Sequence, residues 1–181
     1  VAMGYPALPY LHKDVPALSL LSVILGGNMS SRLFTRVREQ EGLAYSIHAS
    51  RSSFADTGTF VVQAGLDKTR LLTALKLIVE ELRLAADRGV TDNELAHAKE
   101  FIRGKLTIKL EDSESVANFL TSQLLLVGTI KTPEQKFAEL ARVRKPDLQR
   151  VARAIFRPER LTTAIIGPVR SASAVLTALR G

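Results

Sequence analysis

Apolar side chains recur along the chain with two different spacings. Residues three and four positions apart predict a helix between Pro16 and Gly27, then a shorter helix that Ser30 caps and Gly42 ends. After Gly42 the spacing falls to two, which predicts a strand with alternate residues on one side (Leu43, Tyr45, Ile47 and Ala49). A second β-rich run over 59–66 follows turn residues at 55–58, so we expect the two strands to pair as an antiparallel hairpin.

Helical spacing dominates the rest of the chain. One long helix is expected to end at Gly89, and another to begin at Thr91, where Thr91-Asp92-Asn93-Glu94 has the form of a capping box. Residues 112–115 are expected to break this second helix before another apolar stripe (Val116, Leu120 and Leu124). Three further helix starts are predicted from capping residues and prolines (Thr132, Lys145 and Ser171).

Two more strands complete the predicted sheet. Val1 to Tyr5 indicates an edge strand or the end of a strand that leads into a loop, because prolines follow at positions 6 and 9, and Leu161 to Gly167 indicates a final central strand. Runs of helices that interrupt so few strands predict an α+β fold, with a small, mainly antiparallel sheet and helices packed on one face. With no repeat or linker in the sequence, residues 1–181 are expected to form a single domain.

The amino-acid composition excludes several classes of function. Of 181 residues, 46% are hydrophobic and 24% charged, which suits a folded domain with a core. No cysteine is present, which excludes a disulfide scaffold, a thiolate zinc site and a catalytic cysteine. The longest weakly polar run, Ala17 to Gly27, is too short to cross a bilayer as a helix. Because residue 1 is valine and no signal peptide follows, we expect a segment of a longer polypeptide.

The net charge of +7 comes largely from one region. Residues 131–160 hold nine basic side chains against four acidic ones, and three of the basic residues lie on one face of a predicted helix, opposite its apolar stripe (Arg150, Arg153 and Arg157). A solvated helix face is the favoured interpretation. A nucleic-acid surface is the alternative, but such surfaces interleave aromatic residues with the basic ones, and Phe137 and Phe156 here occupy core-like positions.

Metal and nucleophile motifs are missing. The three histidines, at positions 12, 48 and 97, lie far apart, and none belongs to the paired-histidine helix of a zinc peptidase. Glu94 and His97 share a helical face, but a zinc site needs at least one further ligand, so an exposed or capped pair is favoured. Gly26-Gly27-Asn28 precedes a helix and could hold an anion, although a tight turn explains the two glycines better. The sequence therefore assigns no catalytic and no metal-binding residue.

One stretch of the sequence carries a motif that is specific to a single protein family. Residues 25–46 closely resemble the second-domain signature of the pitrilysin/insulinase family of zinc metallopeptidases, which includes mitochondrial processing peptidase, through four successive segments (Leu25-Gly26-Gly27, Ser30-Ser31-Arg32-Leu33-Phe34, Val37-Arg38-Glu39 and Gly42-Leu43-Ala44-Tyr45-Ser46). The similarity continues on both sides of this stretch, so it covers essentially the whole chain (Pro9, His12 and Asp14; Asp56 and Gly58; Gly89-Val90-Thr91, Glu94-Leu95 and Lys99; residues 161–167).

The resemblance implies a metallohydrolase half-domain like that of mitochondrial processing peptidase, with no metal of its own. Zinc would be held by an inverted motif in the first domain of the same parent chain, and a second half-enzyme, as a homo- or heterodimer, would close around a peptide substrate. The family places an arginine and, seven residues later, a tyrosine across the chamber from zinc, and these match Arg38 and Tyr45. Both side chains are hydrogen-bond donors suited to a carbonyl that gains negative charge.

Three hypotheses follow from the sequence. The first is a substrate-positioning second domain of a zinc metalloendopeptidase, inactive by itself, and the second is a non-catalytic companion or scaffold subunit of the same family. A basic nucleic-acid-binding domain is the third and less favoured. Arg38 could instead compensate a helix C-terminus, and Tyr45 could be an ordinary strand aromatic. The bacterial compartment stays open between the cytoplasm and the periplasm, the latter slightly favoured.

Overall fold

Helices pack on one face of a small antiparallel sheet, as the sequence predicts. The structure is a computed structural model that describes residues 1–169 and 171–180. Within these residues the sheet has the strand order β2-β3-β1-β4, and its strands are β1 (Ala2–Ala7), β2 (Ala44–Ser53), β3 (Gly58–Leu66) and β4 (Thr162–Ala164). The predicted hairpin is confirmed, because β2 and β3 pair antiparallel from Ser46↔Gly65 to Ser53↔Gly58.

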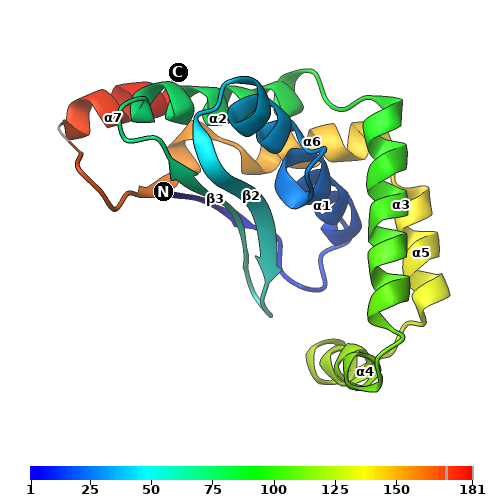
Figure 1. Ribbon diagram of the computed structural model, residues 1–181. Coiled ribbons are helices and arrows are strands. Elements are labelled where there is room, and N and C mark those ends of the chain that lie inside the picture. The colour runs from blue at the N-terminus through cyan, green and yellow to red at the C-terminus, as the bar shows by residue number, and fades with distance from the viewer. Residues whose placement is uncertain (170, 181) are drawn as a thin grey trace.

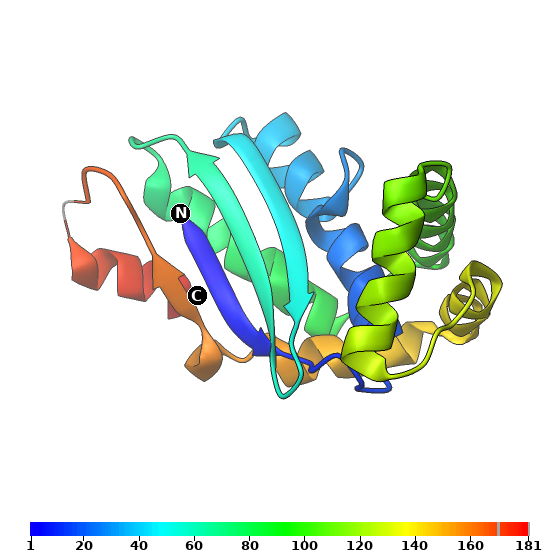
Figure 2. The same ribbon diagram turned by 90° about the horizontal axis from the view of Figure 1, so that it is seen from below.

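The helices lie behind the sheet and, from residue 92 to residue 142, to its right in Figure 2, and the near face of the sheet is uncovered. They are α1 (Val15–Ser22), α2 (Leu71–Asp87), α3 (Asp92–Lys109), α4 (Ser113–Val127), α5 (Pro133–Arg142), α6 (Lys145–Ile155) and α7 (Ala172–Arg180), with shorter π- or 3₁₀-helical segments η1 (Val23–Gly27), η2 (Phe34–Gln40) and η3 (Pro158–Arg160). Between the two layers lies the core, which draws on every strand but β4 and on most helices (Met3, Tyr5, Leu18, Val37, Ile47, Phe60, Val62, Leu75, Ile78, Leu148 and Val151).

Two helix starts follow the predicted capping chemistry closely. Thr91 Oγ1 accepts a hydrogen bond from the backbone N–H of Glu94, and the Glu94 carboxylate accepts one from the N–H of Thr91. Thr132 and Gln135 make the same reciprocal pair at α5. These caps are local, so four consecutive residues suffice to predict them.

The predicted Ser30 cap is wrong. The Ser30 hydroxyl donates to Asn28 Oδ1 at 3.0 Å instead of accepting from the following helix. Asn28 Oδ1 also accepts from the backbone N–H of Ser30, and its carbonyl accepts from the Ser31 hydroxyl. Asn28 therefore organises the turn before η2, because its short amide side chain reaches the backbone two residues on.

For residues 1–5 the edge position is wrong and the strand end that leads into a loop is correct, and the central position predicted for residues 161–167 is wrong. β1 is an inner strand between β3 and β4, and β4 lies at the edge. The proline at position 6 does not prevent this, because β4 pairs with Ala2, Met3 and Gly4 and ends before it. The final strand is shorter than 161–167, and Ile166 beyond it is fully exposed.

The apolar stripe predicted for α4 is not buried. Leu120 and Leu124 are 38% and 55% exposed, and the residue that α4 buries is Gln123. The Gln123 side-chain amide donates to the Lys131 carbonyl and accepts from the Lys131 N–H, which ties α4 to the loop that precedes α5. In Figure 1, α4 lies at the far end of α3, away from the sheet.

A close helix-to-strand approach fixes the relation of η1 to β2. A Cβ atom added at Gly26 would lie 2.4 Å from the backbone nitrogen of Ala49 and 2.7 Å from its Cβ. Both distances are far below van der Waals contact, and the nearest atoms belong to the backbone and a buried alanine, which cannot rotate away. Gly26 is thus required by packing between layers, which is more demanding than the tight turn that the sequence indicates.

We expect Gly26→Ala to destabilise the domain by about 2–4 kcal/mol, because it overpacks a buried backbone contact. Gly104→Ala is the matched control, since a Cβ at this exposed position of α3 meets no atom within 4 Å. Alanine there should be neutral or stabilise by roughly 0.5–1 kcal/mol. Urea denaturation of both variants measures the two changes, and similar stabilities for the pair would contradict the packing argument.

Candidate functional site

A β-bulge turns the Tyr45 side chain out of the core. In the β2–β3 ladder Ala44 pairs with Leu66 and Ser46 pairs with Gly65, so Tyr45 is the extra residue. As a result Leu43 and Ala44 are both buried, while Tyr45 is 88% exposed. The sequence pattern that placed Tyr45 on the side of Ile47 is therefore wrong at this residue, because a bulge shifts the alternation by one position.

Arg38 lies in the last turn of η2, seven residues before Tyr45. Its side chain is exposed, and its guanidinium stacks over the Phe34 ring at 4.7 Å from the ring centre. The backbone then turns at Gly42, whose φ of 58° is readily adopted only by glycine. Leu43 N–H donates to the Val37 carbonyl at 2.9 Å, so the end of η2 and the start of β2 form one compact connection.

Arg70 holds this connection from the loop after β3. Its guanidinium donates to the Gly42 carbonyl at 2.7 Å, to the Glu41 carbonyl at 3.2 Å and to Asp67 Oδ2 at 3.0 Å. Hydrogen bonds from Thr69, and then that from Arg70, lower the pKa of Asp67 to about 2. The sequence analysis did not identify Arg70, because nothing local connects it to carbonyls 28 and 29 residues away.

The uncovered face of the sheet is lined by small and polar side chains. From Tyr45 onward, β2 presents serines and a histidine to solvent (Ser46, His48, Ser50 and Ser52). Opposite them β3 presents small or polar residues and one apolar residue (Thr59, Gln63 and Gly65; Val61). Such a face offers hydrogen-bonding groups and little bulk, which is typical of a surface that faces water or an extended ligand.

Arg32 and Arg36 connect the chain around η2 to the helices that pack behind it. Arg32 donates to both carboxylate oxygens of Glu94 at 2.5 and 2.8 Å and to the Gly89 carbonyl at 3.0 Å. Arg36 Nη1 donates to Glu81 Oε1 at 2.7 Å, and Glu81 is 5% exposed. Both arginines thus form ion pairs with the helices that pack behind η2.

The described residues do not fit a zinc site. No group of three metal-ligating side chains comes together among them. The Glu94 carboxylate is already held by Arg32 and by Thr91, so it has no role as a ligand with His97. Burial opposes ionisation of Glu94, but the hydrogen bonds from Arg32 and Thr91 outweigh it and keep the pKa of Glu94 below its usual value.

The basic face of α6 is used within the fold. Arg150 makes a bidentate pair with Asp14, which lies 136 residues away in the sequence. Arg153 donates to the carbonyls of Ala86 and Asp87 at the C-terminus of α2, where cations are stabilising. These contacts favour the interpretation of a helix surface over that of a nucleic-acid interface.

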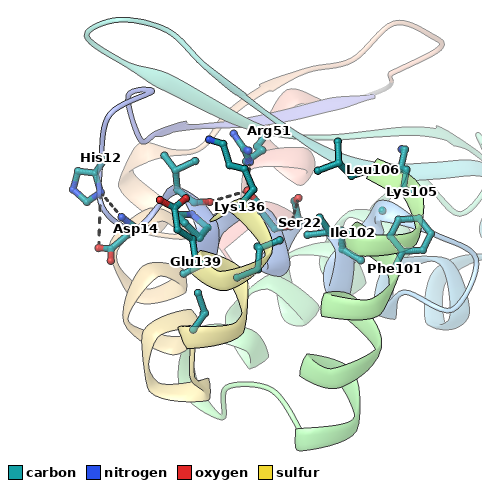
Figure 3. Close-up of a pocket in the computed structure, with 18 of the residues that line it drawn as sticks. His12, Asp14, Ser22, Arg51, Phe101, Ile102, Lys105, Leu106, Lys136 and Glu139 are labelled. Atoms are coloured by element: carbon teal, nitrogen blue, oxygen red, sulfur yellow. Dashed lines mark hydrogen bonds and ion pairs between the residues drawn. The ribbon is translucent and has the colours of Figure 1, made fainter. Parts of the chain in front are cut away.

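A cleft lies away from Arg38 and Tyr45. It holds about 970 Å³ between α1, η1 and β2 on one side and α3 and α5 on the other (Figure 3). The described residues that line it include Arg51 of β2 but neither Arg38 nor Tyr45. Arg51 follows Tyr45 by six positions in β2. At roughly 3.4 Å per strand residue, their Cα atoms lie about 20 Å apart.

Comparison with known proteins identifies the family. The sequence profile of the peptidase M16 inactive domain matches residues 1–102. The chain belongs to the peptidase M16 family. An uncharacterised zinc protease of Streptomyces coelicolor is 35% identical to this M16 domain over 174 residues, which are 96% of the chain and 38% of that protein. The chain therefore spans about two fifths of the length of this relative.

Solved structures agree with the assignment. A protease from Helicobacter pylori superposes with a TM-score of 0.78 at 27% identity, covering 88% of this M16 domain and 39% of that chain. The inactive peptidase domain of a Bordetella parapertussis zinc protease superposes with a TM-score of 0.74 at 19% identity, covering 89% and 87%. The α+β fold and the family that the sequence resembles are both confirmed. Within the described part of the chain, no helix is long and apolar enough to cross a membrane.

We expect Arg32→Ala to lower the free energy of unfolding by about 1.5–3 kcal/mol, because it leaves a half-buried carboxylate without its partner. The folded-state pKa of Glu94 lies below its ordinary value of 4.5, so the stabilisation is present above that pH and is lost as the pH falls through the folded value. The stability difference between the wild type and Arg32→Ala should therefore shrink below about pH 4.5.

Urea denaturation between pH 3 and 7 measures this difference. Arg103→Ala serves as a control, because the Arg103 guanidinium stacks on Phe137 at the surface of α3 and makes no ion pair among the described residues. Its effect should stay within about 1 kcal/mol and should not follow the protonation of Glu94. A stability difference for Arg32→Ala that is constant down to pH 3 would show that the ion pair is not its source.

Proposed function

We propose that this chain is the substrate-positioning C-terminal domain of a zinc metalloendopeptidase that degrades or processes peptides, and that Arg38 and Tyr45 contact the substrate. The observation that carries the proposal is the exposure of Tyr45, which the bulge in β2 turns away from the core. Burying an aromatic ring is favourable. An exposed tyrosine at a bulge is therefore better explained by a ligand contact than by packing.

The two side chains have the chemistry for this role. The guanidinium of Arg38 and the phenol of Tyr45 are both hydrogen-bond donors, and both are exposed to solvent. Donors held in place before the reaction stabilise a carbonyl oxygen as it gains negative charge. Arg70 acts as a positioning residue here, because its hydrogen bonds to Glu41 and Gly42 hold the connection between the two donors.

The metal belongs to another part of the protein in this proposal. The described residues hold no metal cluster, and related proteins of the family are named zinc proteases. Zinc bound by a first domain of the same parent chain would activate water for peptide hydrolysis. This chain would supply binding and orientation, so the isolated domain should be inactive, and a second half-enzyme would complete the chamber.

We expect Tyr45→Phe and Arg38→Ala, each made in the full-length protein, to lower kcat by about 10² to 10³, which is the range for loss of one oxyanion donor. The melting temperature should change little, because both side chains are exposed. Peptide hydrolysis under single-turnover conditions measures the chemical step.

Matched controls separate a substrate contact from a general effect. Tyr10→Phe removes a phenol hydroxyl elsewhere, and Arg88→Ala removes an exposed arginine in the α2–α3 loop. Both should leave turnover unchanged. Wild-type turnover in Tyr45→Phe and Arg38→Ala would refute the positioning role, and a full-length protein without any peptidase activity would instead indicate a companion subunit.

A further inference from the structure

The cleft between α1 and α5 has the size and composition of a ligand site. Its volume of about 970 Å³ lies at the upper end of the roughly 300–1,000 Å³ that is usual for ligand pockets. One wall is apolar and comes mainly from α3, with Phe101, Ile102 and Leu106 facing the cleft in Figure 3. The other walls carry most of its charge.

Two cations converge at one end of the cleft. Figure 3 shows the Lys136 side chain, from α5, extending towards Arg51, from β2. The Arg51 guanidinium donates to two neutral hydroxyls, at 2.8 Å to Ser19 and at 3.3 Å to Ser53. Among the residues that the structure describes, no carboxylate lies within ion-pair distance of either cation.

The acidic side chains that line the cleft already have ion-pair or hydrogen-bond partners within the fold. Glu139 pairs with Lys131, and Asp14 holds the bidentate pair with Arg150. Asp147 accepts from the backbone N–H of Arg144 and from Arg150. Two further lysines line the cleft, at positions 105 and 109, so the open part of its wall is positively charged.

The environment of the two cations is unfavourable for positive charge. Burial lowers the pKa of Arg51. Burial also lowers the pKa of Lys136, and the charges of Lys131 and Arg51 add to this effect against the attraction of Glu139. Two like charges held together and partly desolvated are stabilised when an anion binds between them.

We propose that this cleft binds a peptide segment in which a carboxylate side chain lies next to an apolar residue. The carboxylate binds between Arg51 and Lys136, and the apolar neighbour packs on Phe101, Ile102 and Leu106. A small inorganic anion would satisfy the cations but leave the apolar wall uncovered. The choice of a peptide rests on the proposed function, because a substrate-positioning domain of a peptidase meets peptides.

Isothermal titration of the 181-residue chain with two blocked peptides tests the proposal. A structure of an isolated inactive domain of nearly the same extent exists, so a domain of this kind folds without its parent chain. The probes are acetyl-Ala-Leu-Glu-Leu-Ala-amide, its Gln counterpart and inorganic phosphate. We expect the Glu peptide to bind at least about tenfold more tightly than the Gln peptide, which is the usual size of a charge-assisted hydrogen bond.

Variants then assign the binding to the two cations. Lys136→Met and Arg51→Gln should each weaken the Glu peptide about tenfold without changing the Gln peptide, and Lys136→Arg should retain the wild-type preference. Lys76→Met, at an exposed position of α2, is the control for loss of one positive charge and should have no effect.

Three outcomes would overturn the proposal. They are equal affinities for the Glu and Gln peptides, no binding of either peptide, and phosphate binding as tight as that of the Glu peptide, which would indicate a site for small anions. Each outcome is distinguishable from a failure of the proposed function, because the latter is read from turnover of the Tyr45→Phe and Arg38→Ala variants in the full-length protein.

Discussion

One extra residue in β2 determines what this domain presents to its surroundings. A strand places successive side chains on opposite faces, so without the bulge Tyr45 would lie on the helix-covered side with Ile47, and Ala44 would face solvent. The bulge instead buries Leu43 and Ala44 together and exposes Tyr45 and Ser46 together. The neighbouring connection is held by Arg70 and by the turn at Gly42. The phenol therefore projects from a firmly held backbone.

Positive charge serves two different purposes in the fold. Several cations join elements that are distant in sequence, as Arg32 does with Glu94 and Arg150 with Asp14, and Lys99 donates to the Ala141 and Val143 carbonyls at the end of α5. Such bonds offset helix dipoles and satisfy terminal carbonyls. Arg51 and Lys136 differ, because neither makes an ion pair with a carboxylate among the described residues, although Glu139 lies near Lys136. The excess charge of the chain is thus structural in one place and available to a ligand in another.

Local chemistry made much of the fold predictable. The capping boxes at Thr91 and Thr132, the hairpin and the α+β class all follow from residues that are close in sequence. The order of the strands was not predictable in this way. A proline at position 6 suits an edge strand or a strand end, and only the short β4, which pairs with residues 2–4, shows that β1 is an inner strand. The bulge at Tyr45 was equally hidden, since Leu43, Tyr45 and Ile47 fit an unbroken alternation.

The candidate site was predictable only in part, because some of its residues are close in sequence and others are far apart. The resemblance over residues 25–46 selected Arg38 and Tyr45, whereas periodicity placed Tyr45 in the core. The contacts that hold the site in place join residues 28 to 62 positions apart, such as Arg70 to Gly42 and Arg32 to Glu94. No spacing rule encodes pairs of this separation, so the supporting residues could only be found from the fold. The same holds for the cleft, whose two cations come from β2 and α5.

In the proposed function, this domain acts together with a zinc-bearing partner. Arg38 and Tyr45 carry hydrogen-bond donors, a guanidinium and a phenol hydroxyl. Carboxylates that could accept a proton are committed to ion pairs where they matter for the fold, as Glu94 and Glu81 are. In the proposed function the domain therefore orients and polarises a peptide, and zinc in another domain activates the water that attacks it. Under the two proposals, β2 would offer donors at Tyr45 on one face and a cationic cleft at Arg51 on the other, so that one domain would hold a peptide at two separate points.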